Sequence, residues 1–213
     1  MVFQMIKTNK NLRLIILSVV LFSACMLTAQ EEIKSVKIGN QVWTVENLNV
    51  DHYRNGDSIP EVKSQQQWSD LKTGAWCYYK NDSKNGEKYG KLYNWYAVND
   101  PRGLAPKGWR IPSQSELLEL QSAVNDNSNL LKAVGEGSGS GTGTNSTGFS
   151  VKLGGYRGYH GNYYYIGYDS YFWTSSEGTP PFASSMYVYS TGNYIFFYDF
   201  DKVYGFSVRC IRD

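Results

Sequence analysis

The second half of the chain is a succession of short segments that each have the composition of a β-strand. Between residues 149 and 210, runs rich in Tyr, Phe, Trp and Val alternate with Gly, Asn and Ser. Such runs, separated by turn residues, are typical of antiparallel strands and do not fit a helical bundle. The clearest pair, 186–189 and 194–198, is joined by the sequence Ser-Thr-Gly-Asn. We therefore predict a sheet-rich second half that closes with a strand at 205–211.

The first half combines a predicted hairpin with the clearest helix start in the chain. Apolar positions recur through residues 33–45 around Gly39-Asn40, a dipeptide typical of a tight β-turn. Ser113 and Glu116 have the spacing of a capping box. An apolar stripe follows them, made of Leu117, Leu120 and Val124. The sequence therefore predicts a helix that begins after Ser113.

Three shorter elements are expected between the hairpin and this helix. Residues 64–71 predict a short amphipathic helix capped by Ser64, and residues 75–79 predict a strand that ends in a polar turn at 81–86. Apolar residues three and four apart predict a second helix at 90–98. Helices in the first half and strands in the second indicate an α+β fold.

The first 29 residues have the pattern of a signal peptide. A basic start leads into an apolar run at 14–21 and then into small residues. Two cleavage sites are open: cleavage before Cys25, with lipidation of that cysteine, and ordinary cleavage after Ala29. Both place the mature domain, residues 30–213 in the second case, outside the cytoplasm. We expect an extracellular or outer cell-surface location.

The formal charge of +2 depends on the leader. Three basic residues and no acidic ones lie in the first thirty positions, which leaves 18 basic and 19 acidic residues in the rest of the chain. Nucleic acids and anionic lipids are recognised by a strong basic excess, which is missing here. We predict no nucleic-acid partner, and membrane contact only through a lipid anchor at the N-terminus.

Two cysteines remain after the leader, Cys77 and Cys210. Because exported chains with an even number of cysteines usually pair them, we predict a disulfide between these two. The alternative is a pair of buried thiols that pack as small hydrophobic groups.

Few residues have the pattern of a catalytic or metal site. The two histidines, His52 and His160, have no second ligand at metal spacing, so we predict surface-loop residues, no metal and no cofactor. The Gly-rich segment 135–148 lacks the Gly-Lys-Ser/Thr ending of a phosphate loop and is predicted to be a flexible surface loop. Asp199 and Asp201 are carboxylates of the last hairpin without a clear partner, so the chain is not predicted to be an enzyme.

Aromatic residues are the surplus of this chain, with 18 Tyr, 9 Phe and 6 Trp. We assign most of the tryptophans to the core, namely Trp43, Trp76, Trp95, Trp109 and Trp173. Consecutive tyrosines on a strand must face both sides of it, so some of the late tyrosines are exposed. The candidate ligand-binding residues are Tyr159, Asn162, Tyr164, Tyr168, Tyr198 and Asp199. The alternative is a solvated strand surface without a ligand.

Six segments in this order resemble the Fibrobacter succinogenes major paralogous domain family. They are residues 36–48, 89–98, 106–116, 154–157, 172–177 and 205–210. The family consists of exported, often lipid-anchored bacterial surface proteins without an established activity. Its helix and its Gly-Phe-Ser-Val-Arg ending are similar to those of C-type-lectin-like and formylglycine-generating-enzyme folds. The resemblance implies a compact, irregular α+β domain with few short helices and twisted antiparallel sheets.

The chain departs from these patterns in three ways. Ala105 stands where the family commonly has a cysteine, so Cys210 pairs with Cys77 or stays free. The close cysteine pair of formylglycine-generating enzymes is missing, and so are the Glu-Pro-Asn and Gln-Pro-Asp triplets of calcium-dependent lectins. We expect a non-catalytic surface module that binds a glycan or a protein through Tyr-rich loops. The alternatives are an enzyme of unrecognised type and a structural envelope protein.

Overall fold

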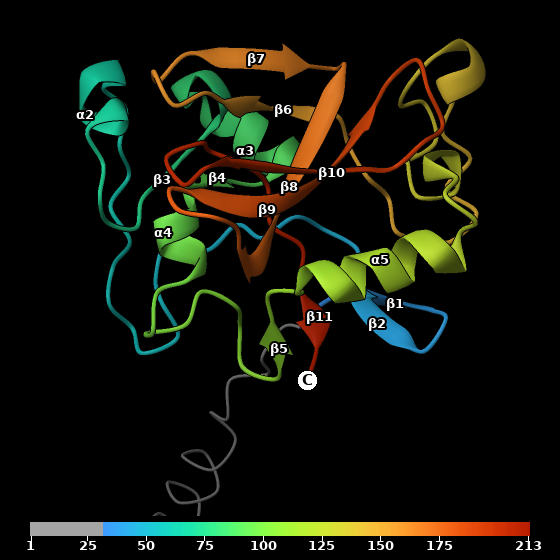
Figure 1. The fold of residues 1–213 in the computed structure, drawn as a ribbon, viewed down its shortest axis with the longest axis horizontal. Helices are drawn as coiled ribbons and strands as arrows, with labels where there is room; N and C mark the ends of the chain where they lie inside the picture. The colour runs from blue at the N-terminus through green and yellow to red at the C-terminus, as the bar shows by residue number, and fades with distance from the viewer. Residues whose placement is uncertain (1–31) are drawn as a thin grey trace, which may run out of the picture. The chain divides into compact units, whose positions relative to one another are not determined.

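The structure, a computed structural model, describes residues 32–213 (Figure 1). The predicted signal peptide at 1–29 and the candidate lipidation site Cys25 lie outside these residues. The described part is mixed α+β, with many strands and a few short helices, which confirms the predicted class. Residues Lys34–Asp213 form one compact unit.

The largest sheet contains five strands from the second half of the chain, in the order β10-β9-β8-β6-β7. Its strands are β6 (Gly154–Arg157), β7 (Tyr163–Ile166), β8 (Asp169–Glu177), β9 (Phe182–Tyr189) and β10 (Phe196–Asp201). All neighbours are antiparallel except β6 and β8, which pair in parallel at Gly155 and Ser170. The predicted hairpin of the last strands is confirmed as β9-β10, and β10 forms one edge of the sheet.

Two smaller sheets join distant parts of the chain. One has the order β1-β2-β11-β5, and the other pairs β3 with β4. Their strands are β1 (Ser35–Ile38), β2 (Gln41–Thr44), β3 (Trp76–Cys77), β4 (Leu92–Tyr93), β5 (Trp109–Arg110) and β11 (Ile211–Arg212). The hairpin β1-β2 turns at Gly39, whose φ of 59° suits glycine, as predicted. The predicted closing strand is shortened to β11, with isolated bridges from Phe206 and Ser207 before it.

The helices are short, and two of the predicted boundaries were wrong. The described helices are α2 (Gln65–Ser69), α3 (Ser83–Tyr89), α4 (Trp95–Val98) and α5 (Gln114–Ala123), with 3₁₀ turns at Tyr79–Asn81, Ser128–Leu130 and Gly139–Gly141. The predicted turn at 81–86 is largely α3, because Asp82 caps it by accepting the Lys84 N–H. The predicted helix 90–98 divides into β4 and α4, because Asn94 caps a new helix start. The capping box of α5 is present as predicted.

Helix α5 covers one face of the five-stranded sheet (Figure 1). Leu117 and Leu120 pack in one buried cluster with Phe172, Met186 and Val188 of the strands. A second cluster surrounds Trp68. All six tryptophans are at most 7 % exposed, which confirms the prediction that most of them belong to the core.

The predicted disulfide is not formed. Cys77 and Cys210 are free thiols, and both are buried. Cys77 lies on β3 in the Trp68 cluster, whereas Cys210 donates its N–H to the Thr44 Oγ1 beside β11, so the two thiols belong to different sheets. Burial raises the pKa of Cys77 to about 11 and that of Cys210 to about 12, so both stay protonated at neutral pH.

Two buried arginines hold loops in place through backbone carbonyls. Arg157 is fully buried and donates to the carbonyls of Gly161, Val62, Lys63 and Ser64 at 2.6–3.1 Å. Arg209 donates to the Asn47 side chain and to the carbonyls of Thr44, Phe149 and Ser150. Each guanidinium therefore satisfies backbone acceptors that would otherwise be buried alone.

The Gly-rich segment is a packed loop. The Nζ of buried Lys132 donates to the Tyr189 carbonyl at 3.0 Å and to the Gly192 carbonyl at 2.7 Å, next to this loop. A Cβ at Gly141 would lie 2.0 Å from the Ser190 carbonyl oxygen, so only glycine allows this close backbone approach. In this segment Gly137, Gly141 and Gly143 are therefore required by close backbone packing.

Candidate binding site

The face of the five-stranded sheet opposite α5 is covered by aromatic rings. Tyr171 of β8 pairs with Tyr187 of β9, which pairs with Phe196 of β10. Their rings stack in a row, with centroids 5.0 and 5.1 Å apart and interplanar angles of 19° and 18°. Because side chains alternate along a strand, this row points away from Phe172 and Met186 on the core face.

The aromatic face continues toward the last loop of the chain. Tyr156 of β6 contacts the rings of Tyr164, Tyr171 and Tyr204 at centroid distances of 5.4, 4.8 and 5.9 Å. Burial raises the pKa of Tyr156 to about 12 and also raises the pKa of Tyr204. These phenols are therefore neutral at physiological pH and act as hydrogen-bond donors and acceptors.

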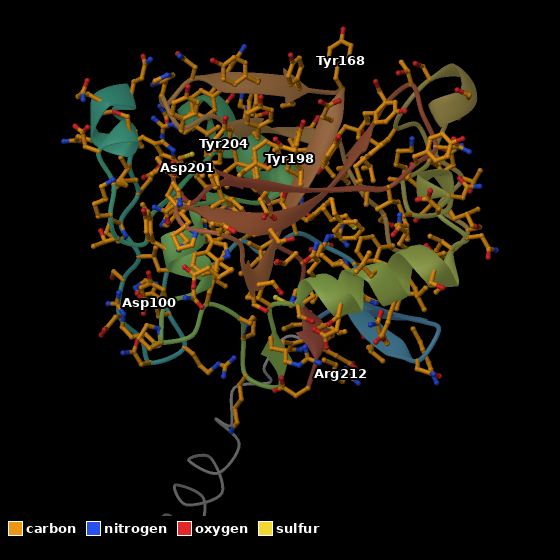
Figure 2. All side chains as sticks on the ribbon, in the orientation of Figure 1. Asp100, Tyr168, Tyr198, Asp201, Tyr204 and Arg212 are labelled. Carbon is orange, nitrogen blue, oxygen red and sulfur yellow. The ribbon has the colours of Figure 1, made fainter. Side chains whose placement is uncertain are left out.

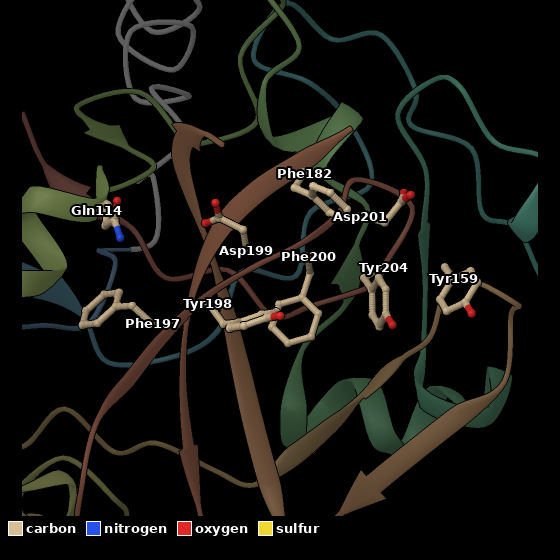
Figure 3. A pocket seen from close by; sticks show the side chains of 9 residues that line it. All are labelled: Gln114, Tyr159, Phe182, Phe197, Tyr198, Asp199, Phe200, Asp201 and Tyr204. Carbon is tan, nitrogen blue, oxygen red and sulfur yellow. The ribbon is translucent and has the colours of Figure 1, made fainter. Parts of the chain in front are cut away.

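A cleft of about 690 Å³ opens at the edge of this face, along β10 (Figure 3). Its lining consists of six aromatic residues, one amide and two carboxylates. These are Tyr159, Phe182, Phe197, Tyr198, Phe200, Tyr204, Gln114, Asp199 and Asp201. Its size is that of a small-ligand site.

The alternation of β10 divides the lining into two sides. Tyr198 and Phe200 face one side of the strand, and Asp199 and Asp201 face the other (Figure 3). On the aromatic side, ring contacts run from Tyr198 to Phe200 at 5.2 Å, on to Tyr204 at 5.2 Å and on to Tyr159 at 5.5 Å. The cleft thus wraps around a free sheet edge, with the rings of Tyr198 and Phe200 on one flank and the two carboxylates, together with Phe182, on the other.

The two carboxylates are held differently. Asp201 Oδ1 accepts the N–H of Val203 at 2.9 Å, which fixes this side chain in the turn after β10. Asp199 is exposed, and within residues 32–213 its carboxylate forms no ion pair or hydrogen bond to protein. A Cβ at Gly178 would lie 2.5 Å from Asp199 Oδ2, so glycine leaves the space that this carboxylate occupies. Asp199 is therefore open to an external donor.

A family profile, described as the Fibrobacter succinogenes major domain, matches residues 36–212. The chain belongs to this family. The match extends from β1 to β11 and includes the whole lining of the cleft. Comparisons with curated proteins and with solved structures each give no match. The assignment to this family confirms the resemblance read from the sequence, while the lectin-like character of the fold stays a prediction.

The major domain brings half of the predicted binding residues into the cleft. Tyr159, Tyr198 and Asp199 line it, whereas Asn162, Tyr164 and Tyr168 do not. Tyr168 is 64 % exposed in the turn between β7 and β8, away from the labelled group of Tyr198, Asp201 and Tyr204 (Figure 2). Tyr164 lies on β7 against Tyr156. Asn162 is exposed, and its backbone carbonyl accepts the Gly158 N–H.

Six lining residues were not among the predicted binding residues: Gln114, Phe182, Phe197, Phe200, Asp201 and Tyr204. Phe200 could have been found, because it lies two residues after Tyr198 on the same strand and must share its face. Phe182 pairs with Asp201 across β9 and β10, which requires knowledge of the register. Gln114 and Tyr204 come from α5 and from the last turn, and no local pattern places them beside β10.

One hydrogen-bonded chain in the major domain has the residue order of a hydrolase triad. Asp51 Oδ1 lies 2.6 Å from His52 Nδ1, and His52 Nε2 lies 3.1 Å from Ser58 Oγ. The hydrogen bond to His52 is the main reason that the pKa of Asp51 is lowered. All three side chains are exposed, whereas the aspartate of a hydrolase triad is buried behind its histidine. We assign these bonds to the stability of the 51–58 turn, and His52 and His160 are both surface residues as predicted.

Residues 32–213 show neither of two further features, a cluster of metal ligands and a membrane-spanning helix. In this range no group of three or more His, Cys, Asp or Glu side chains is placed to hold a metal ion. In the same range no helix is both long and apolar enough to span a membrane.

Proposed function

We propose that the major domain is a non-catalytic carbohydrate-binding module that takes a glycan in the cleft along β10. One observation carries this proposal: six aromatic residues, Gln114 and two carboxylates line a concave site of about 690 Å³ on the surface. The flat C–H faces of sugar rings pack on aromatic rings, and the sugar hydroxyls donate to carboxylates and phenols. A glycan uses both flanks of this cleft.

The concavity of the site favours a glycan over a protein partner. Protein interfaces are broad and mostly flat, of about 800 Å² on each side. The aromatic flank is a single chain of four rings, Tyr159, Tyr204, Phe200 and Tyr198, and the carboxylates lie across β10 from it. A few sugar units fill such a site, and a rigid aromatic wall loses little entropy on binding them.

The arrangement of the carboxylates supports binding without hydrolysis. Glycosidases place two carboxyl groups on opposite sides of the bond that breaks. Asp199 and Asp201 extend from the same side of one strand (Figure 3), and Asp201 already accepts the Val203 N–H. They are therefore placed to hold hydroxyl or amino groups side by side.

We further propose that the domain works outside the cytoplasm, as its signal-peptide-like residues 1–29 suggest. Anchoring through a lipid on Cys25 and free secretion after cleavage at Ala29 give different masses. Intact-mass measurement of the exported protein distinguishes them, since only the anchored form carries a diacylglyceryl group.

The test of the binding proposal is a glycan array probed with three proteins. These are the wild type, the double variant Tyr198→Ala/Tyr204→Ala, and the control Tyr194→Ala. Tyr194 is also exposed and lies near Phe196, but it does not line the cleft. We expect the wild type and the control to retain the same glycans and the double variant to lose them. An empty array for the wild type, or equal retention by the double variant, contradicts the proposal.

A further inference from the structure

The charged residues of the cleft are all acidic. Its lining contains Asp199 and Asp201 and no Lys or Arg. The surrounding sequence follows the same pattern, since residues 158–201 include four acidic residues and no Lys or Arg at all. Every strand from β7 to β10 lies in this stretch. The negative charge of the cleft therefore has no basic counterpart on the strands that build it.

The basic side chains nearest in sequence to this stretch bind other partners. Lys202 follows Asp201 directly, but its Nζ pairs with Glu177 and lies 4.7 Å from the centroid of the Trp95 ring. Arg157 is buried on four backbone carbonyls. Neither cation neutralises Asp199, which has no protein partner among the described residues. The cleft lining therefore combines two carboxylates with six aromatic rings and no basic side chain.

Resting on the proposed function, we propose that the glycan bound in this cleft carries positively charged amino groups, as a polymer of de-N-acetylated amino sugars does. Two features of the site recognise an ammonium group. Carboxylates attract it by charge, and the faces of Tyr and Phe rings attract cations within about 6 Å. An amino group fixed on a stacked sugar ring meets both features without an extra flexible chain.

Other occupants fit these charges less well. An acidic glycan is repelled by Asp199 and Asp201, and a neutral glycan offers them hydroxyl donors but no opposite charge. A second copy of the chain, paired edge to edge through β10, places the aspartates of the two strands close together, and like charges on an edge strand oppose such pairing. A lysine-rich peptide has the right charge, but its long, flexible side chains lose more conformational entropy when they are held than an amino group fixed on a sugar ring does.

The experiment compares an oligosaccharide of glucosamine with the N-acetylglucosamine oligosaccharide of equal length, by calorimetric titration. The titration is run at about pH 6, where amino groups are protonated. We expect the wild type to bind the glucosamine compound at least about tenfold more tightly, with a preference that shrinks as salt is added. We expect Asp199→Asn/Asp201→Asn to lose the preference. The control Glu46→Gln/Asp70→Asn removes the same charge from exposed sites outside the cleft and keeps the preference.

The outcomes separate this inference from the proposed function. Equal or tighter binding of the N-acetylated compound, or an array ligand that is neutral or acidic, overturns the inference and leaves glycan binding in place. Tighter binding of polylysine than of the glucosamine compound also overturns it, because the ligand class is then a basic peptide. Loss of binding to every glycan overturns both proposals.

Discussion

The buried arginines of this fold and the aspartates of its cleft differ in how many hydrogen bonds they form to protein. Arg157 and Arg209 lie inside the domain, where they donate to seven backbone carbonyls and one side-chain amide. Asp199 and Asp201 lie at the surface, with a single hydrogen bond from the Val203 N–H between them. The buried arginines therefore have many protein partners, whereas the carboxylates of the cleft have almost none.

This difference distinguishes structural charges from functional ones. A buried charge is tolerated only when its hydrogen bonds are complete, so Arg157 and Arg209 are explained by the loops that they join. A surface carboxylate needs no such partners and remains available to a ligand. The aromatic residues divide similarly: the tryptophans fill the core, and the rings of Tyr198, Phe200 and Tyr204 line the cleft.

The largest effect is expected from Arg157→Met. This change leaves the carbonyls of Val62, Lys63, Ser64 and Gly161 without their donor, and an unsatisfied buried acceptor costs about 1–3 kcal/mol. We expect the free energy of unfolding, measured by urea denaturation, to fall by about 3 kcal/mol or more. The control Arg212→Met removes an exposed arginine and should change it by less than about 0.5 kcal/mol. Equal losses of stability for the two variants would contradict the structural role that we assign to Arg157.

Lys132, a third buried cation, should make the free energy of unfolding depend on pH. Burial lowers the pKa of Lys132 to about 8 in the folded chain, below its value of about 10.4 when unfolded. Between these values the unfolded state holds more protons, so the free energy of unfolding rises with pH. Relative to Lys132→Met, we expect the wild type to gain about 1–2 kcal/mol from pH ~8 to ~9.5. Parallel stability curves for the two proteins contradict a buried, charged Lys132.

A smaller effect, on affinity alone, is expected from Tyr198→Ala. Tyr198 is 64 % exposed, so its removal should leave the free energy of unfolding within about 0.5 kcal/mol of the wild type. Glycan affinity should fall about tenfold, which equals about 1.4 kcal/mol. A large loss of stability with unchanged affinity reverses the assignment and makes Tyr198 a structural residue.

The smallest effect is expected from Tyr168→Ala. Tyr168 is as exposed as Tyr198, but it lies in the turn after β7 and does not line the cleft. The glycan affinity and the free energy of unfolding of this variant should both match those of the wild type within error. A loss of affinity as large as that of Tyr198→Ala would extend the binding surface across the sheet to the β7–β8 turn.

Local patterns predicted the parts of the fold that depend on local chemistry. The capping box of Ser113 and Glu116 and the Gly39 turn formed as expected. The segment 81–98 was misassigned, because the caps at Asp82 and Asn94 compete with the apolar periodicity around them. The predicted disulfide failed because cysteine count carries no information on which sheet each thiol joins.

The cleft was predictable only along its own strand. Tyr198 and Asp199 were found from the last hairpin, but Gln114 and Tyr204 reach the cleft through tertiary packing of α5 and the last turn. The absence of Lys and Arg from residues 158–201 is a further signal visible in the sequence, and it gains meaning only once β7 to β10 are known to share one sheet.

The most direct test of the central claim is chemical-shift mapping by NMR of the ¹⁵N-labelled domain, titrated with a glycan retained on the array. The account predicts shifts at the backbone amides of Tyr198, Asp199, Phe200 and Tyr204, with unchanged signals from Tyr168 and from α2. Shifts confined to any other surface, with the β10 edge unchanged, would contradict it.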